Sequence, residues 1–444
     1  MSEEEILINE KVTDQEIEVE DIAQDFPGSQ YFANLPENWK IVKIKEIAKI
    51  TSGTTPLRSN KSYHTNGTVP WVKTTDLNNS EIIDTEEKIT ELALKETSLR
   101  VYPVDTVLVA MYGGFNQIGR TGILGIEATI NQALSAITVD KERINPSFLL
   151  NWLNAKVGWW KNFAGSSRKD PNITSKDVGN FPFLMIPVNE QRAIASLFDS
   201  FNSAINQNNR LIAQKELRKK WLMQNLLTGK KRLRGFEDTK WKIRPLEDFI
   251  RPVIRQVAKP ETPYLGLGIR SHGKGTFLKR DEQPEKNSMD KFYVVHANDL
   301  IVNITFAWEQ AIAIAQPKDD GALASHRFPT YRFIQDKGFP DFFRFYIIQP
   351  RMKYMLELIS PGGAGRNRVM SKSDFIKLEF LLPDHKEQVA IAEVVSAADK
   401  EIQLLRAKTE KLREQKKGMM QVLLTGKKRL KLDDYENTRH TDKV

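Results

Sequence analysis

One stretch of the chain approaches the pattern of a nucleotide-binding loop. Residues 268–275 read GIRSHGKG, which follows G-x-x-x-x-G-K but places Gly275 where a Ser or Thr hydroxyl would hold Mg²⁺. The corresponding stretch in the first half of the chain, KTTDLNNS from Lys73, contains no glycine. We therefore expect a surface loop here, and phosphoryl transfer through Lys274 is the least favoured interpretation.

Other patterns that would indicate catalysis or a bound cofactor are missing from the sequence. The six histidines show no metal-ligand spacing such as H-E-x-x-H, and neither G-x-S-x-G nor G-x-G-x-x-G occurs. Cysteine is absent, which excludes disulfides and thiolate metal sites. We expect no catalytic, cofactor-binding or metal-binding residue in this chain.

Side chains suited to reading nucleic acid do occur, in segments that differ between the two halves of the chain. Arg pairs with guanine and Asn or Gln with adenine in the major groove, whereas Lys and loop amides hold phosphates. Each residue taken alone is more simply explained as a solvated surface side chain. The candidate DNA-contacting residues are Arg58, Lys73, Tyr112, Asn116, Gln117, Arg120, Arg168, Lys169, Arg270, His272, Lys274, Trp308, Gln310, Arg327, Arg366, Asn367 and Arg368.

The charge distribution favours a polyanionic partner. The first 25 residues carry ten acidic side chains against Lys11 alone, and so −9. Because the whole chain carries +9, the remainder carries +18. A basic body of this kind is typical of proteins that bind nucleic acid. The acidic head is expected to be an accessory segment of open role.

These candidates must be positioned by a chain that contains one architectural unit twice. MQNLLTGKKRLR, Met223 to Arg234, returns as MQVLLTGKKRLK, Met420 to Lys431, with ten of twelve positions identical. The period of 197 residues suits a domain plus a connecting helix. Gly229 and Gly426 follow the last apolar turn of each copy, which predicts a helix C-cap, and a basic run follows each glycine.

Upstream of each copy, apolar residues recur with alternating spacings of four and three. A seam of this period predicts coiled-coil packing, most simply between the two repeated helices. Packing of each helix on its own domain is the alternative. The predicted seam is Ile194, Phe198, Phe201, Ile205, Ile212, Leu222, Ile391, Val395, Ile402, Leu405, Leu412 and Met419.

The segments between the helices predict two similar mixed α/β domains. Each opens on a Trp-led strand, at Trp39 and Trp241, and closes with an apolar strand that runs into Pro187 or Pro383. The predicted fold class is α+β with a pseudo-twofold internal repeat, in which two long helices pair as a coiled coil. The expected parts are an acidic extension (1–35), domain one (36–187), a central helix (188–235), domain two (236–383), a C-terminal helix (384–432) and a tail (433–444).

Taken together, these features closely resemble the specificity subunit of type I restriction-modification enzymes. The most specific matches are P-x-N-E-Q-R-A-I-A at Pro187 to Ala195 and the duplicated L-L-T-G-K-K-R-L. The second copy of the helix start, PDHKEQVAIA, contains one extra residue. The resemblance extends from about Asn38 to Lys431 and leaves out the acidic head.

The resemblance implies a non-catalytic subunit whose two domains are target recognition domains, each reading one half of a split DNA site. It implies that the two long helices form an antiparallel coiled coil that spaces these domains. It also implies two methyltransferase subunits that use S-adenosylmethionine, and two translocase-nuclease subunits that use ATP and Mg²⁺. Alternatives are the recognition subunit of a system that cuts on both sides of its site, and a coiled-coil scaffold for acidic proteins. With an acidic N-terminus and no apolar run of 18 residues, a cytoplasmic protein is expected.

Overall fold

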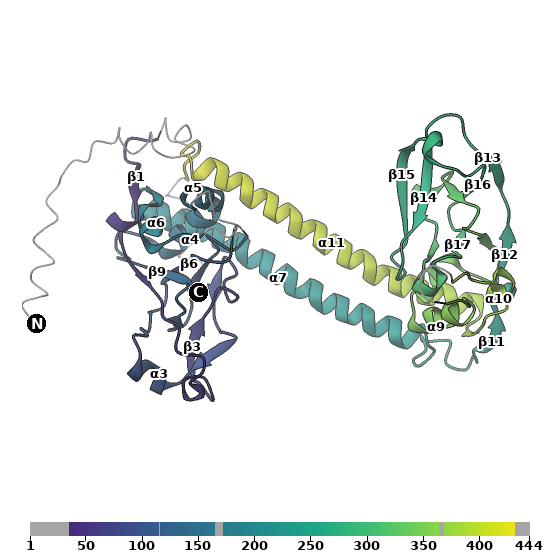
Figure 1. The fold of residues 1–444 in the computed structure, drawn as a ribbon, viewed down its shortest axis with the longest axis horizontal. Helices are drawn as coiled ribbons and strands as arrows, with labels where there is room; N and C mark the ends of the chain where they lie inside the picture. The colour runs from purple at the N-terminus through teal and green to yellow at the C-terminus, as the bar shows by residue number, and fades with distance from the viewer. Residues whose placement is uncertain (1–34, 115, 165–171, 364–367, 431–444) are drawn as a thin grey trace, which may run out of the picture. The chain divides into compact units, whose positions relative to one another are not determined.

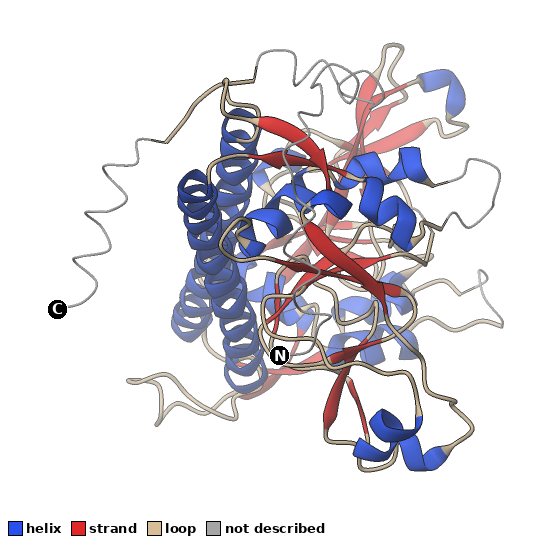
Figure 2. Cartoon of the chain, turned by 90° about the vertical axis from the view of Figure 1, so that its left-hand side faces the viewer, coloured by secondary structure: helices blue, strands red, loops and turns tan. Residues whose placement is uncertain are grey.

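The computed structural model describes residues 35–114, 116–164, 172–363 and 368–430. The chain forms two compact units, the first made of residues 1–208 with 408–444 and the second of residues 209–407. Each unit contains one domain and parts of both long helices. The two domains are built from short strands and short helices (Figure 1, Figure 2).

In the first unit, the strands that open and close the domain pair with each other. β1 (Lys40–Lys43) lies antiparallel to β10 (Pro182–Met185), so the two ends of the domain meet. A five-stranded sheet has the order β2 (Ala48–Ser52), β9 (Leu134–Val139), β6 (Val107–Ala110), β7 (Thr121–Leu124) and β4 (Glu81–Ile82). A second sheet has the order β5 (Glu87–Ile89), β3 (Val69–Val72) and β8 (Thr129–Ile130). The helices are α3 (Glu91–Glu96), α4 (Pro146–Ala155), α5 (Trp160–Phe163) and α6 (Ser175–Asn180).

The second unit repeats this plan. β11 (Lys242–Pro245) pairs antiparallel with β21 (Glu379–Leu382). One sheet has the order β12 (Ile250–Val253), β20 (Thr330–Phe333), β17 (Leu300–Val302) and β18 (Ile312–Ile314). The other has the order β13 (Gln256–Ala258), β16 (Lys291–Val294), β19 (Leu323–Ser325), β14 (Tyr264–Ile269) and β15 (Thr276–Glu282). Its short helices are α8 (Pro340–Tyr346), α9 (Pro350–Leu358) and α10 (Lys372–Ile376).

The long helices are α7 (Val188–Leu226) and α11 (His385–Leu423), of 39 residues each. In the first unit, the Lys416 Nζ donates to Asn202 Oδ1 at 2.7 Å, and burial lowers the pKa of Lys416. In the second unit, Lys215 pairs with Glu401 at 2.5 Å, and Lys219 pairs with Asp399. Residue numbers rise along one helix as they fall along the other, so the helices form an antiparallel coiled coil.

Burial along both helices follows the four-three spacing. The seam residues that are buried are Ile194, Phe198, Ile391, Val395 and Ile402. Phe201, Ile205, Ile212, Leu222, Leu405, Leu412 and Met419 are half-buried. Polar residues also occupy the seam, because Asn208 and Thr409 are buried within the first unit. Exposed large residues off the seam are Leu211, Leu217, Trp221 and Leu404.

A buried glutamine near the start of each long helix joins the helix to its domain. The Gln191 amide donates to the carbonyls of Arg143 and Ile186 at 3.0 and 2.8 Å, and its oxygen accepts from the Asn145 amide at 2.9 Å. Gln388 makes the equivalent three bonds in the second unit. Both glutamines are fully buried, so their polar groups depend on these bonds.

The repeated L-L-T-G-K-K-R-L segment also binds the start of the opposite long helix. In the second unit, the Arg232 Nε and Nη2 donate to the two carboxylate oxygens of Glu387 at 2.7 and 2.6 Å. The Trp241 Nε1 donates to the same carboxylate at 3.0 Å. In the first unit, Arg429 pairs in the same way with Glu190. We call the Arg232–Glu387–Trp241 and Arg429–Glu190 contacts the arginine latches.

The predicted C-cap glycines adopt the conformation that such a cap needs. Gly229 has φ +70° and Gly426 has φ +72°, in the left-handed region that favours glycine. A Cβ at Gly229 would lie 3.2 Å from the Trp241 ring, and one at Gly426 would lie 2.8 Å from Pro36. Gly229 therefore lets the segment after α7 approach the second domain, and Gly426 lets the segment after α11 approach the first domain.

Candidate nucleic-acid interface

In the first domain, two candidate cations lie on one carboxylate. Arg58 Nη1 and Lys73 Nζ each bind Glu87 at 2.7 Å, and the Arg58 guanidinium lies 5.0 Å above the centre of the Trp71 ring. Hydrogen bonds from Arg58 and Lys73 lower the pKa of Glu87, and the Glu87 bond raises the pKa of Lys73. Lys73 Nζ also lies 3.6 Å from the exposed Glu86 carboxylate, so two carboxylates face the two cations, and a phosphate could replace Glu87 as their partner.

A second group of candidates lies on the loop that follows β6. Tyr112 is 43% exposed and Asn116 is exposed, while Arg120 Nη1 donates to Gln117 Oε1 at 3.2 Å. The backbone of Met111 fixes the loop, because its amide donates to the Ala133 carbonyl at 2.8 Å and its carbonyl accepts from the Ile173 amide at 3.0 Å. Arg168 and Lys169 lie outside the described residues.

The second domain uses the same backbone connections. The Ile304 amide donates to the Arg327 carbonyl at 3.1 Å, and the Ile304 carbonyl accepts from the Met370 amide at 2.9 Å. Both Arg327 Nη1 and Trp308 Nε1 donate to Thr305, at 3.3 and 3.2 Å. The Arg368 guanidinium lies 5.4 Å from the centre of the Trp308 ring. Three loops thus bring two arginines and an indole to one surface.

The GIRSHGKG stretch is the hairpin between β14 and β15. A phosphate-binding loop leads from a strand into a helix, whereas this loop leads from a strand into a strand. The His272 amide donates to the Glu309 carbonyl at 2.7 Å, which ties the hairpin to the loop after β17. Arg270 Nη1 donates to the Thr276 carbonyl at 2.7 Å, and Lys274 is exposed. The hairpin therefore joins the Arg327, Trp308 and Arg368 surface.

One candidate occupies a place unsuited to DNA contact. Gln310 is 6% exposed, and its amide donates to the carbonyls of Ile347 and Gln349 at 2.9 and 3.3 Å. Its backbone has φ +60°, at the end of a short 3-10 turn. These bonds assign Gln310 to the framework, so its inclusion among the DNA-contacting candidates is corrected. Arg366 and Asn367 lie outside the described residues.

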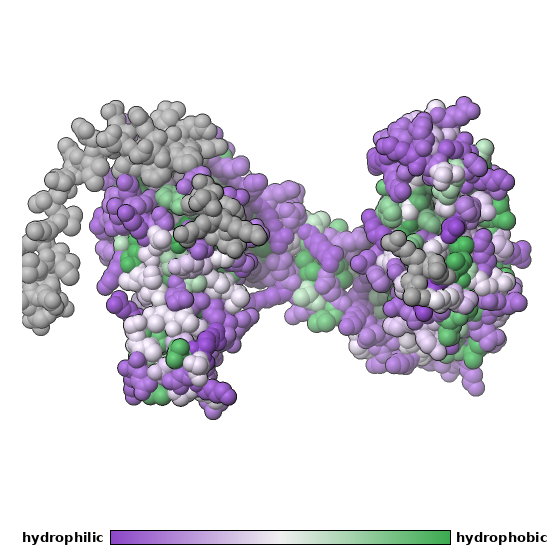
Figure 3. Space-filling view, in the orientation of Figure 1, coloured by the Kyte–Doolittle hydropathy of each residue, from purple (hydrophilic) through white to green (hydrophobic). Residues whose placement is uncertain are grey.

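No sequence pattern singles out Glu87, because its partner Arg58 lies 29 residues away. Within the part of the chain that the structure describes, no group of three or more His, Asp or Glu side chains could hold a metal ion. None of the helices in that part is long and apolar enough to cross a membrane. Figure 3 shows hydrophilic residues mixed with paler and apolar residues on the visible faces of both domains.

A duplicated framework that presents two different cationic and aromatic loop surfaces defines a sequence-reading scaffold. Comparison with known families agrees with this class. The model of the type I restriction modification DNA specificity domain matches residues 36–216 and 239–414, which together make up most of the chain. The protein belongs to this family.

Individual relatives match this chain over most of its length. The type I restriction enzyme MjaVIII specificity subunit of Methanocaldococcus jannaschii is 22% identical over 423 residues, 89% of this chain and 94% of the relative. The crystal structure of the type I restriction-modification system S subunit from M. genitalium superposes with a TM-score of 0.54 at 13% identity, covering 87% of this chain and 97% of that one. A chain from a structure concerning complex assembly and conformational transition of the type I R-M system has a TM-score of 0.51 at 14% identity, covering 88% and 98%.

Proposed function

We propose that this protein is the DNA specificity subunit of a cytoplasmic type I restriction-modification complex, and that it recognises a split DNA target. Each domain would read one half-site. The observation that carries this proposal is that equivalent backbone bonds at Met111 and Ile304 support loops with different side chains. A fixed framework with different loops is what two unlike half-sites require.

The coiled coil would set the distance between half-sites. A helix of 39 residues is about 58 Å long at 1.5 Å per residue. This length exceeds one turn of DNA, which is about 34 Å. Two half-sites separated by unspecified bases are therefore compatible with the length of α7 and α11.

The catalytic groups would come from partner subunits. We propose two methyltransferase subunits that supply S-adenosylmethionine chemistry, and two translocase-nuclease subunits with ATP and Mg²⁺ in the restriction form. Exposed apolar side chains on the helices, Leu217 at 69% and Leu404 at 62%, support protein docking there. Figure 3 shows apolar residues gathered on the long helices.

Mapping of methylated bases in genomic DNA tests this function. DNA from cells that carry the complete system should show modified adenine in a bipartite motif, and cells that lack this chain should lose that modification. A continuous, unsplit motif would contradict one half-site per domain.

A further inference from the structure

A cavity of about 360 Å³ opens on the five-stranded sheet of the second unit. The rings of Phe277, Phe306 and Phe328 line it, and two glycines of β14, Gly266 and Gly268, form part of its wall. A Cβ at Gly268 would lie 2.3 Å from the Phe277 ring, so only glycine lets that ring lie against the strand. Aromatic walls beside a bare backbone suit a flat apolar ring.

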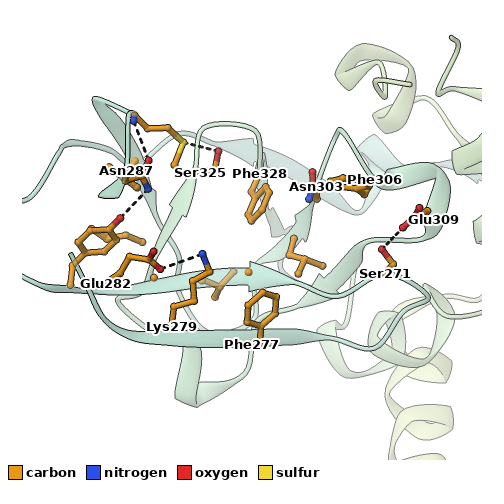
Figure 4. Close-up of a pocket in the computed structure, with 18 residues that line it drawn as sticks. Ser271, Phe277, Lys279, Glu282, Asn287, Asn303, Phe306, Glu309, Ser325 and Phe328 are labelled. Atoms are coloured by element: carbon orange, nitrogen blue, oxygen red, sulfur yellow. Dashed lines mark hydrogen bonds and ion pairs between the residues drawn. The ribbon is translucent and has the colours of Figure 1, made fainter. Parts of the chain in front are cut away.

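The charged groups of the cavity lie toward its ends, and the polar side chains of Asn303 and Ser325 line it between them. Figure 4 shows Lys279 and Glu282 toward one end and Ser271 and Glu309 toward the other, with Phe277 and Phe328 between them. Lys279 Nζ lies 3.3 Å from Glu282, and Ser271 Oγ donates to Glu309 at 2.6 Å. A carboxylate has acceptor capacity for about four hydrogen bonds. Two carboxylates repel a phosphate but can accept hydrogen bonds from the amino group of a base.

The cavity borders the cationic surface already described. Phe306 belongs to the same loop as Thr305 and Trp308, and Phe328 directly follows Arg327. Arg327 and Arg368 can therefore hold backbone phosphates beside an opening that itself excludes them. The surface is thus basic outside the cavity, whereas the lining is aromatic and, with Lys279 against Glu282 and Glu309, carries a net negative charge. This pattern matches a nucleotide whose base alone enters.

In the first domain, bulkier side chains stand at the matching position. In the parallel pairing with the next strand, Trp71 lies opposite Thr129 of β8 and Gly266 lies opposite Leu323 of β19, so Trp71 stands where the second domain has Gly266. The Arg58 guanidinium covers the Trp71 ring, and Glu87 binds Arg58 and Lys73. The protein's own side chains thus occupy this surface of the first domain.

We propose that the cavity of the second domain receives one base of the bound DNA, swung out of the stack, and that this base carries an exocyclic amino group. The energy of unstacking would be offset by stacking of the base on the aromatic walls. The inference rests on the proposed function, because it requires duplex DNA at these loops. It also predicts that only one half-site is distorted.

The test uses the full chain without methyltransferase subunits, since those could extrude a base themselves. Duplexes of the mapped target carry 2-aminopurine beside each adenine or cytosine in turn, and fluorescence and binding are both measured. We expect a rise of several-fold at one position, confined to the half-site of the second domain. Phe328→Ala and Gly266→Leu should each abolish the rise and weaken specific binding on the order of ten-fold.

Tyr354→Ala is the matched control, because this aromatic residue of α9 is 58% exposed and lies outside the cavity lining. It should leave the fluorescence rise unchanged. Specific binding with no rise at any position would overturn the cavity proposal and leave the proposed function standing. If neither the wild-type chain nor its complex with the methyltransferase subunits bound any DNA sequence preferentially, both the cavity proposal and the proposed function would be overturned. Thermal unfolding of each variant verifies that it is folded.

Discussion

Replacing Arg232 with methionine should destabilise the second unit by about 3–5 kcal/mol, because it leaves a buried carboxylate without its cation. Glu387 is 2% exposed and accepts two bonds from Arg232, at 2.7 and 2.6 Å. The Trp241 Nε1–H, at 3.0 Å, would still donate a hydrogen bond to the Glu387 carboxylate in this variant. The lost interaction is charge-assisted and bidentate, which places it among the stronger hydrogen-bonded pairs.

Calorimetric unfolding measures this effect. A change of 1 kcal/mol shifts Tm by about 2–4 °C in a unit of this length, so we expect a loss on the order of 6–20 °C. Glu387→Gln should cost less, because Arg232 can still reach water and the Thr239 carbonyl at 2.5 Å. The loss of stability in the double variant, Arg232→Met with Glu387→Gln, should be smaller than the sum of the losses in the two single variants.

The exposed Lys230→Met serves as a surface control and should shift Tm by no more than a degree or two. Arg429→Met, in the latch of the first unit, should destabilise that unit to a similar degree. If Arg232→Met unfolds at the wild-type temperature, the Arg232–Glu387 pair contributes no net stability to the second unit, which would refute this prediction.

Three further predictions concern packing, pH and charge. Phe198→Ala should cost about 3–5 kcal/mol in urea unfolding, because the ring is fully buried, whereas Leu217→Ala, at 69% exposed, should stay within about 0.5 kcal/mol; equal effects would contradict the seam. Burial raises the pKa of Tyr331 to about 12, above about 10 in the unfolded chain, so its contribution is complete below pH 10 and is lost as the pH rises toward 12. Tyr331→Phe should reduce the loss of stability between pH 9 and pH 11 by roughly 1.3 kcal/mol in urea titrations, and an unchanged loss would show that Tyr331 titrates normally. Glu87→Gln should free Arg58 and leave Lys73 with Glu86 as its carboxylate partner, strengthen non-specific DNA binding and steepen its salt dependence by about one phosphate contact, whereas Glu96→Gln, which alters the acceptor of a Tyr63 bond, should do neither.

The long-range plan of the fold was predictable because repetition and periodicity are written in the sequence. The 197-residue offset predicted two like domains and the four-three spacing predicted paired long helices, and both predictions are confirmed, as is the antiparallel arrangement that the family resemblance implied. The Trp-led and proline-ended strands proved to be direct partners, β1 with β10 and β11 with β21. The helices are longer than the seam alone indicates, because they also include the buried Gln191 and Gln388.

The details of the surface could not be predicted, because they depend on which side chains the fold brings together. Nothing near Gln310 in sequence shows that its amide would bond to carbonyls 37 and 39 residues away. Glu87 neutralises part of the charge of Arg58 and Lys73 by the same kind of distant contact. The basic run after each long helix follows the helix C-cap, as its sequence predicts. Its arginine, Arg232 or Arg429, also binds a glutamate at the start of the opposite long helix, which no local pattern indicates.

The central claim is that each domain reads its own half of a split site. The most direct measurement exchanges residues 36–187 for those of a relative with a different specificity and maps methylated bases in cells that carry the complete system. The account predicts that one half of the motif changes while the other half and the spacing between them stay the same. A change in both halves, or in the spacing alone, would contradict it.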